Sequence, residues 1–284
     1  KALISVSNKE NLKPLLQILK KNKIKIISSG GTYKEIKKLK FQCTEVSNYT
    51  KSPEILDGRV KTLHPKIYAG ILNQRNKKSH RKDLIKNNFD EIDLVIVNFY
   101  PFEKTLKKTS NHNEILSKID IGGPTMVRAA AKNYNDVTVI TSNSQYNELI
   151  EQIKNNKGFT TLKFRKKMSQ IAFAETAYYD AVISNYFNKI DNINFPHKKI
   201  IYGNLISKLR YGENPHQESA VYSKNNILDI HQIHGKKLSY NNLNDIFSAL
   251  TISKSFPKNI GTVILKHANP CGVSSLKNNL NSFK

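Results

Sequence analysis

Four short segments in the first half of the chain combine groups that bind phosphate or move protons with backbone that lets a ligand approach. The first is the loop 28–32, Ser-Ser-Gly-Gly-Thr. Its paired glycines let backbone N–H groups point at one anion, and Ser29 and Thr32 add hydroxyl groups where a helix should begin. Three polar residues from the end of the first apolar run should lie beside it: Ser5, Ser7 and Lys9. We predict a phosphate site here. A plain tight turn is the alternative, because the loop matches neither a Walker motif nor a dinucleotide fingerprint.

The second segment, residues 57–65, reads Asp-Gly-Arg-Val-Lys-Thr-Leu-His-Pro. Arg59 and Lys61 are two residues apart, so in extended backbone both side chains face the same side. Arginine offers a planar fork to a phosphate or a carbonyl, and lysine a compact charge. Only six of the 46 Lys and Arg residues are arginine, which favours a role for Arg59 that lysine could not fill. A solvated loop is the alternative.

The third segment is Asn-Phe-Tyr-Pro-Phe at residues 98–102, where a strong apolar run ends. Further along the chain, residues 120–125 place Asp120 before a Gly-Gly turn that leads into a predicted helix. Asp120 either moves a proton or caps the turn. Arg128 and Lys132 are four residues apart on that helix and therefore share one face.

The second half of the chain holds two further polar segments, residues 209–217 and 266–272. Lys266 and His267 follow the apolar run 263–265 and should emerge at the end of a strand. A neighbouring cation favours the neutral imidazole, which can act as a general base. A lone histidine of this kind is more often structural.

Thiol and metal chemistry have less support in this sequence. Cys271 could act as a nucleophile, but it has no paired base nearby in the sequence. His231 and His234 have a spacing that could ligate a metal, but no further Cys or His cluster accompanies them; we predict no metal site. Cys43 and Cys271 are the two cysteines, too few for a disulfide framework, and they suit a reducing compartment.

The elements that position these residues follow from the apolar patterns. Short apolar runs alternate with helical patterns, which predicts a parallel sheet with helices on both faces, and ligands at the carboxyl ends of its strands. The expected strands are 2–6, 24–27, 94–99 and 137–141. The expected helices begin at an Asn8 N-cap, after residue 32, at about residue 144 and at about residue 160. The apolar stripe of the helix 160–187 indicates core packing.

The chain of 284 residues divides by pattern into a domain at 1–190, a linker at 191–200 and a second unit at 201–284. The second unit is expected to be incomplete at residue 284. The chain opens at Lys1 without Met, directly in an apolar run, and ends in polar residues. We therefore expect it to be a piece of a longer protein.

Composition excludes several classes of protein. Hydrophobic residues make up 38% of the chain, enough for a globular core. The longest aliphatic runs, such as 94–97, are too short to span a bilayer, and no signal peptide opens the chain. These features argue against a secreted or membrane-spanning protein.

The net charge of +24 arises from 46 basic and 22 acidic residues. Such a charge raises the possibility of nucleic-acid binding. The lysines, however, are spread along the chain together with Asn and Ile, with no basic block. This pattern favours drift toward AT-rich codons over a surface for polyanions. In either case small phosphorylated substrates are attracted.

Seven of these segments, in order along the chain, resemble the bifunctional purine-biosynthesis enzymes with IMP cyclohydrolase and AICAR formyltransferase activities. The resemblance implies an α/β fold: a methylglyoxal-synthase-like doubly wound parallel sheet, followed by an incomplete, cytidine-deaminase-like transformylase segment. It also implies a cytoplasmic protein that is a homodimer when intact. The matching segments are 5–9, 29–32, 58–65, 98–102, 120–132, 210–217 and 266–272.

By resemblance, the first domain converts formyl-AICAR to IMP with loss of water and needs no cofactor. The residues implied to hold the 5′-phosphate are Ser7, Lys9, Ser29, Gly31 and Thr32, with Ser5 beside them. Those implied to contact the base and the ribose phosphate are Arg59, Lys61, Thr62 and Asn98. The implied catalytic residues are Lys61, Tyr100, Asp120 and Lys132. Asp120 and Lys132 would act on the formyl oxygen, and Lys61 and Tyr100 on the carboxamide proton.

The second domain of such enzymes transfers a formyl group from 10-formyltetrahydrofolate to AICAR. By resemblance His267 is the base, Lys266 its electrostatic partner, and Arg210 and Tyr211 contact substrate. We expect the chain to be competent at most for ring closure, because the resemblance ends early in this domain. Two alternatives remain open: a regulatory domain of the same fold that binds a phosphate ligand without chemistry, and a basic nucleic-acid-binding protein.

Overall fold

The computed structural model describes residues 1–224, 228, 230–258, 260–278, 281 and 283. It divides into two units, residues 1–200 and 201–284, and each is described by itself. Among the described residues, no helix combines the length and the apolar character needed to cross a bilayer.

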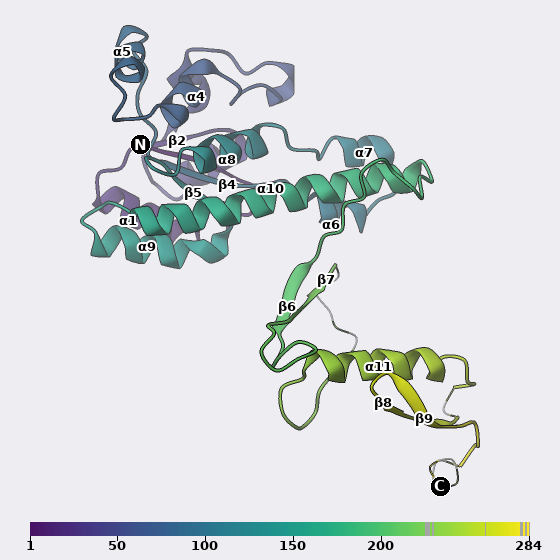
Figure 1. The fold of residues 1–284 in the computed structure, drawn as a ribbon. Helices are drawn as coiled ribbons and strands as arrows, with labels where there is room; N and C mark the ends of the chain where they lie inside the picture. Colours follow the sequence, from purple (N-terminus) through teal and green to yellow (C-terminus); the bar gives the residue numbers. More distant parts are fainter. Residues whose placement is uncertain (225–227, 229, 259, 279–280, 282, 284) are drawn as a thin grey trace. The chain divides into compact units, whose positions relative to one another are not determined.

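Five parallel strands form the sheet of the first unit (Figure 1). They are β1 (Ala2–Val6), β2 (Ile26–Ser28), β3 (Thr44–Glu45), β4 (Leu94–Asn98) and β5 (Thr138–Ile140). β1 lies in the middle of the sheet and is almost entirely buried. This burial explains why it is apolar at every position except Ser5, since a strand of a parallel sheet is covered on both faces.

The strand order is β3-β2-β1-β4-β5. The chain moves outward from β1 to β3 in one direction and then returns to place β4 on the other side of β1. Ala2 pairs with Ile26 on one side and with Leu94 on the other. The order therefore reverses between β1 and β4, and in such sheets a ligand crevice opens at the carboxyl ends of the strands at this point.

Helices cover both faces of the sheet. α1 (Leu12–Lys21) packs against α9 (Tyr146–Asn155), whereas α8 (Gly122–Lys132) packs against α4 (Pro65–Leu72), α10 (Leu162–Ile190), β4 and β5. Right-handed crossovers that run in opposite directions place α1 and α8 on opposite faces. The remaining helices of this unit are α2 (Gly30–Lys38), α3 (Val46–Thr50), η1 (Leu56–Gly58), α5 (Lys78–Lys86), α6 (Phe102–Leu106), α7 (His112–Leu116) and η2 (Asn143–Gln145).

The alternating strands and helices predicted from the sequence are confirmed, with shifts at their ends. The Asn8 N-cap is wrong. The side chain of Asn8 accepts a hydrogen bond from the N–H of Glu10 at 2.9 Å, and Asn11 adopts the left-handed conformation with φ 58°. The chain therefore makes an extra turn before α1 begins at Leu12. α10 begins later than expected because Thr161 caps it, its hydroxyl accepting from the N–H of Phe164 at 3.2 Å.

The described residues of the second unit include two antiparallel strand pairs and one long helix. β6 (Asn204–Lys208) pairs with β7 (Ala220–Ser223), and β8 (Thr262–Lys266) pairs with β9 (Asn269–Ser274). α11 (Tyr240–Ser253) packs against β8 and β9. Ser239 begins α11 as a capping box with Asn242, and Leu243 is buried.

Candidate active site

A cavity of about 870 Å³ lies where the order of the strands reverses. The ends of β1 and β4, the first turns of α2 and α8, and the loop 57–62 all contribute to its wall. Most residues that the sequence singles out in the first unit therefore meet in one place. The cavity is lined by Ser5, Ser7, Lys9, Ser29, Gly31, Thr32, Arg59, Lys61, Thr62, Asn98, Tyr100 and Asp120.

The predicted phosphate loop forms one corner of the cavity. Ser29 is only 5% exposed, and its hydroxyl has no hydrogen-bond partner among the described residues. α2 begins at the very next residue, so N–H groups of its first turn have no partner within the helix. The ammonium of Lys9 is close enough to Gly31 that a Cβ there would lie 3.8 Å from Nζ. A buried free hydroxyl, a helix N-terminus and a cation make a corner suited to an anion.

Thr32 plays a different part from the one predicted. Its hydroxyl accepts a hydrogen bond from the N–H of Val6 at 2.9 Å and donates one to the carbonyl of Val6, also at 2.9 Å. Thr32 is buried, so these bonds fix the loop to the end of β1. The side chain shapes the corner, and its hydroxyl is already committed to the backbone.

Asn98 at the end of β4 likewise holds the neighbouring loop. Its side-chain oxygen accepts from the N–H groups of Ser7 and Asn8 at 2.6 and 2.9 Å, and its amide donates to the carbonyl of Asn8 at 3.1 Å. Those three hydrogen bonds connect the end of β4 to the residues that follow β1, at the point where the strand order reverses. They set the position of the β1–α1 loop at the mouth of the cavity.

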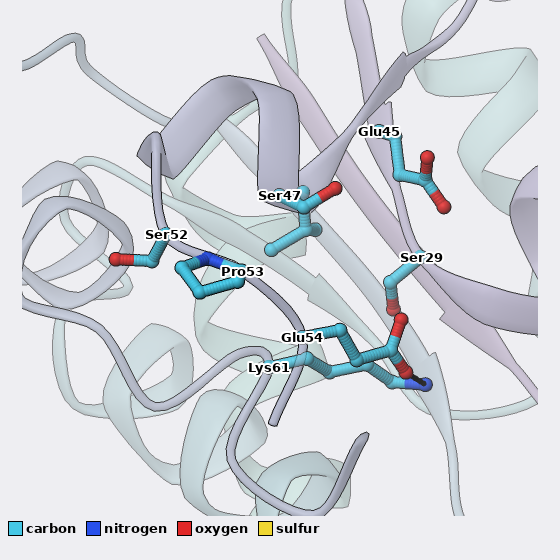
Figure 2. Close-up of a pocket in the computed structure, with 8 residues that line it drawn as sticks. Ser29, Glu45, Ser47, Ser52, Pro53, Glu54 and Lys61 are labelled. Carbon is cyan, nitrogen blue, oxygen red and sulfur yellow. Dashed lines mark hydrogen bonds and ion pairs between the residues drawn. The ribbon is translucent and has the colours of Figure 1, made fainter. Parts of the chain in front are cut away.

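The loop 57–62 brings two cations to the cavity in a conformation the sequence did not predict. Extended backbone was expected, but Arg59 is helical, with φ −66° and ψ −22°. Arg59 and Lys61 line the cavity nonetheless. Nζ of Lys61 lies 3.3 Å from Oε1 of Glu54 (Figure 2). Thr62 is buried beside Gly122. A Cβ at Gly122 would lie only 2.5 Å from Oγ1 of Thr62. The glycine therefore allows the first turn of α8 to pack against this loop.

Asp120 lies in the turn that leads into α8. Its Oδ1 accepts a hydrogen bond from the N–H of Gly123 at 2.9 Å, so the carboxylate also caps the turn. Burial raises the pKa of Asp120 above the usual carboxyl range, while hydrogen bonds from the backbone of Gly123 and Tyr100 and the charge of Lys61 act in the opposite direction. A carboxyl group with a raised pKa carries a proton more often than an exposed one, as a general acid requires.

Lys132 does not join the other predicted catalytic residues. It is exposed in the last turn of α8 and does not line the cavity. Gly122, at the other end of α8, does line it. Ten residues of helix separate the two, about 15 Å at 1.5 Å per residue. Lys132 therefore lies outside the lining of this cavity, and its catalytic role beside Asp120 stays a prediction.

In the second unit, Lys266 ends β8, as expected, and His267 begins the turn to β9 with φ 53°. Both side chains are exposed. The guanidinium of Arg210 lies over the ring of Tyr211, 4.8 Å from its centre, and its Nη2 donates to the Tyr211 hydroxyl at 3.1 Å.

α11 contacts both predicted pairs of the second unit. The N–H of Tyr240 donates to the carbonyl of Tyr211 at 3.1 Å, and Oδ1 of Asp245 accepts from the N–H of Ala268 at 2.7 Å. The first half of α11 therefore connects the two segments, which are far apart in the sequence.

Comparison with known proteins identifies the family. A family model described as the AICARFT/IMPCHase bienzyme matches residues 130–284, more than half of the chain. The chain belongs to this family. A model of the MGS-like domain matches residues 11–125. The resemblance drawn from the seven segments is thereby confirmed, as is the α/β fold.

The bienzyme family is also represented among curated relatives named "Bifunctional purine biosynthesis protein PurH". The chain is 43% identical to that of Bradyrhizobium diazoefficiens, over 96% of this chain and 53% of the relative. It is 44% identical to that of Prochlorococcus marinus strain MIT 9515, over 100% of this chain and 56% of the relative. The chain thus spans about half the length of the curated relatives it matches.

One solved structure adds a likeness in fold. The crystal structure of ForH superimposes with a TM-score of 0.59 at 27% sequence identity. The match covers 66% of this chain and 97% of that one.

Several residues at the site of this AICARFT/IMPCHase chain were not predicted from the sequence. Asn113, Leu116 and Ser117 line the cavity, and Glu54 and Tyr179 contact residues that line it. Glu54 pairs with Lys61 from seven residues earlier, in a stretch without any periodic pattern. Tyr179 of α10 accepts a hydrogen bond from the N–H of Asp120 at 2.8 Å. It lies next to an apolar stripe that the helical spacing assigns to the core. Nothing in the neighbouring sequence distinguishes a tyrosine that only packs in the core from one whose hydroxyl also holds a loop.

Proposed function

We propose that the first unit closes the purine ring of formyl-AICAR to give IMP and water. The proposal rests on the lining of a single cavity. Ser29 and Gly31 form its anion-binding corner, and Lys61, Tyr100 and Asp120 line the same cavity. Family membership supports the same reaction. IMP cyclohydrolase activity belongs to the bienzyme that the family description names.

The reaction joins the carboxamide nitrogen to the formamide carbon, and the formyl oxygen leaves as water. Overall, the carboxamide nitrogen and the formamide nitrogen each give up one hydrogen, which balances the two hydrogens of the water. Asp120 is suited to protonate that oxygen, because it lines the cavity and burial shifts its pKa in the direction that favours the protonated form. Lys61 and Tyr100 line the same cavity and are assigned to the proton that the carboxamide gives up. Developing charge on the oxygen is stabilised by the cations of the cavity. No metal or organic cofactor takes part in this scheme.

The rest of the nucleotide is assigned to the other walls. The 5′-phosphate fits the corner made by Ser29, the first turn of α2 and Lys9. Arg59 lines the cavity as a second cation, and its planar fork suits the ribose phosphate or a carbonyl of the base. Phosphate binding at this corner supplies the orientation on which ring closure depends.

The experiment that tests the proposal follows IMP formation from formyl-AICAR with the purified chain. Lys61→Ala should abolish turnover. Lys13→Ala should not, because Lys13 is an exposed lysine of α1 outside the cavity. If the folded wild-type chain binds IMP but forms none, the proposal is wrong, and the chain is instead a binding domain of the same fold.

For the whole protein we propose the second activity as well, transfer of a formyl group from 10-formyltetrahydrofolate to AICAR. His267 would be the base, Lys266 its partner, and Arg210 and Tyr211 would contact substrate. The contacts of α11 with both segments support their action as one site. We also propose a cytoplasmic homodimer that binds these nucleotides, with no role for nucleic acid or membrane.

A further inference from the structure

The ammonium of Lys61 is paired with a carboxylate that the scheme above does not use. Lys61 Nζ lies 3.3 Å from Oε1 of Glu54, and the two side chains run together in Figure 2. We propose that Glu54 is a positioning residue that holds the Lys61 ammonium at the edge of the cavity for ring closure. This inference rests on the function proposed above.

Lys61 lines the large cavity, whereas Glu54 does not. A small pocket of about 10 Å³ adjoins the large cavity, and Ser29 and Lys61 line both of them. Glu54 lines the small pocket and is not part of the lining of the large one. A nucleotide in the cavity would therefore contact Lys61 and not Glu54, so Glu54 acts through the lysine.

The backbone around the ion pair leaves room for it at two glycines. Gly30 and Gly58 have φ values of +53° and +83°, in the left-handed region that favours glycine. A Cβ at Gly30 would lie 2.8 Å from Nζ of Lys61, and one at Gly58 would overlap Oε1 of Glu54. Each member of the pair thus occupies space that any side chain at these two positions would take.

The arrangement also explains why a second carboxylate is useful. Lys61 lies close enough to Asp120 for its charge to oppose the raised pKa of that carboxyl. A lysine side chain is long and flexible, so without Glu54 its ammonium could move toward Asp120. Such a shift would stabilise the ionised form of Asp120, which is the wrong form for a general acid. Glu54 therefore keeps the two catalytic groups apart.

The ion pair is half exposed, with side-chain exposures of 25% for Lys61 and 43% for Glu54. Pairs of this kind contribute little to folding stability. Loss of Glu54 should therefore appear in the position of the lysine and in the chemical step, with the urea midpoint of unfolding unchanged. This difference separates positioning from a structural role.

The test compares Glu54→Gln with Glu45→Gln, a matched control that removes another carboxylate of the small pocket. For Glu54→Gln we expect kcat for ring closure to fall roughly 10- to 100-fold, the size of effect that a misplaced catalytic group has. KM should change by less than about twofold, since the lost interaction matters in the transition state. Glu45→Gln should match wild type.

A second readout does not depend on turnover. Reductive methylation with ¹³C-formaldehyde keeps the lysine charge, and the Lys61 resonance can be assigned with Lys61→Arg. Glu54→Gln should shift this resonance and Glu45→Gln should not. Wild-type kcat in Glu54→Gln, or an unshifted resonance, would overturn the inference and leave the proposed function standing. If the wild-type chain itself forms no IMP, the proposed function fails, and the resonance alone decides whether Glu54 positions Lys61.

Discussion

The hydroxyl of Tyr179 on α10 holds the turn that carries Asp120. It accepts a hydrogen bond from the N–H of Asp120 at 2.8 Å and donates one to the carbonyl of Lys118 at 3.3 Å. Tyr179 is 8% exposed, and burial raises the pKa of its phenol to about 12. The hydroxyl therefore remains protonated and can form both bonds at physiological pH. In this way the long helix positions Asp120, although Tyr179 itself does not line the cavity.

Tyr179→Phe removes these two bonds and keeps the ring. A partly buried N–H and a carbonyl lose their partner, which should lower the free energy of unfolding by about 1–3 kcal/mol. The Asp120 turn should loosen, and kcat for IMP formation should fall roughly tenfold or more. Urea unfolding and steady-state kinetics measure the two effects on one preparation.

Tyr178→Phe is the matched control for that variant. The hydroxyl of Tyr178, one residue earlier on α10, donates to Oε2 of Glu103 at 3.1 Å. Its removal should leave kcat close to wild type. Equal losses of kcat in the two variants would show that any lost hydroxyl on α10 disturbs the site, and the positioning role of Tyr179 would be wrong.

Asp120 should give ring closure a dependence on pH. The scheme needs the protonated carboxyl, whose pKa is raised by burial. Activity should therefore fall as the pH rises through that pKa, and it should be retained on the acidic side for as long as the chain stays folded. Asp120→Asn should lose most activity and lose this limb of the profile. An unchanged limb in Asp120→Asn would assign it to another group.

The same pKa makes a prediction about stability. Because the pKa of Asp120 is higher in the folded chain than in the unfolded chain, the folded state binds this proton more tightly. The resulting stability is present at low pH and is lost as the pH rises through the folded-state pKa. The asparagine side chain in Asp120→Asn is uncharged both below and above this pKa. Its free energy of unfolding should therefore exceed that of wild type at neutral pH, and the difference should shrink on acidification.

The sequence was a good guide wherever one local pattern decides the structure. Apolar runs located the strands, because strands of a covered parallel sheet admit few polar residues. Glycine pairs and polar residues at strand ends located the cavity, because carboxyl ends of parallel strands meet at one edge. Helix starts were less predictable: Asn8 is a good N-cap residue, yet it makes a local turn instead.

The parts of the site that the sequence did not reveal depend on contacts between distant residues. Glu54 and Tyr179 act through partners that only the folded chain brings near. Lys132 shows the converse: its motif is continuous with Asp120, but it lies in the last turn of α8 and outside the lining of the cavity. The order of the motifs along the chain indicates the family. The fold determines which of the motif residues line the same cavity.

Ser29 and Thr32 carry similar hydroxyl groups in one loop and should respond to mutation in opposite ways. The Ser29 hydroxyl is buried without a partner, so Ser29→Ala removes no internal bond and should leave the free energy of unfolding unchanged. If this hydroxyl binds the phosphate, its loss should weaken IMP binding by roughly tenfold, the value of one hydrogen bond to a charged group. Isothermal titration with IMP measures the affinity.

Thr32→Val keeps the shape of the side chain and removes both bonds to Val6. The buried N–H and carbonyl of Val6 are left unsatisfied, so the free energy of unfolding should fall by about 1–3 kcal/mol. The Thr32 hydroxyl is already bonded to the backbone. Any loss of IMP affinity should therefore come only from greater mobility of the loop. If Ser29→Ala destabilises the chain and binds IMP like wild type, the Ser29 hydroxyl has a structural partner and the anion corner is misassigned.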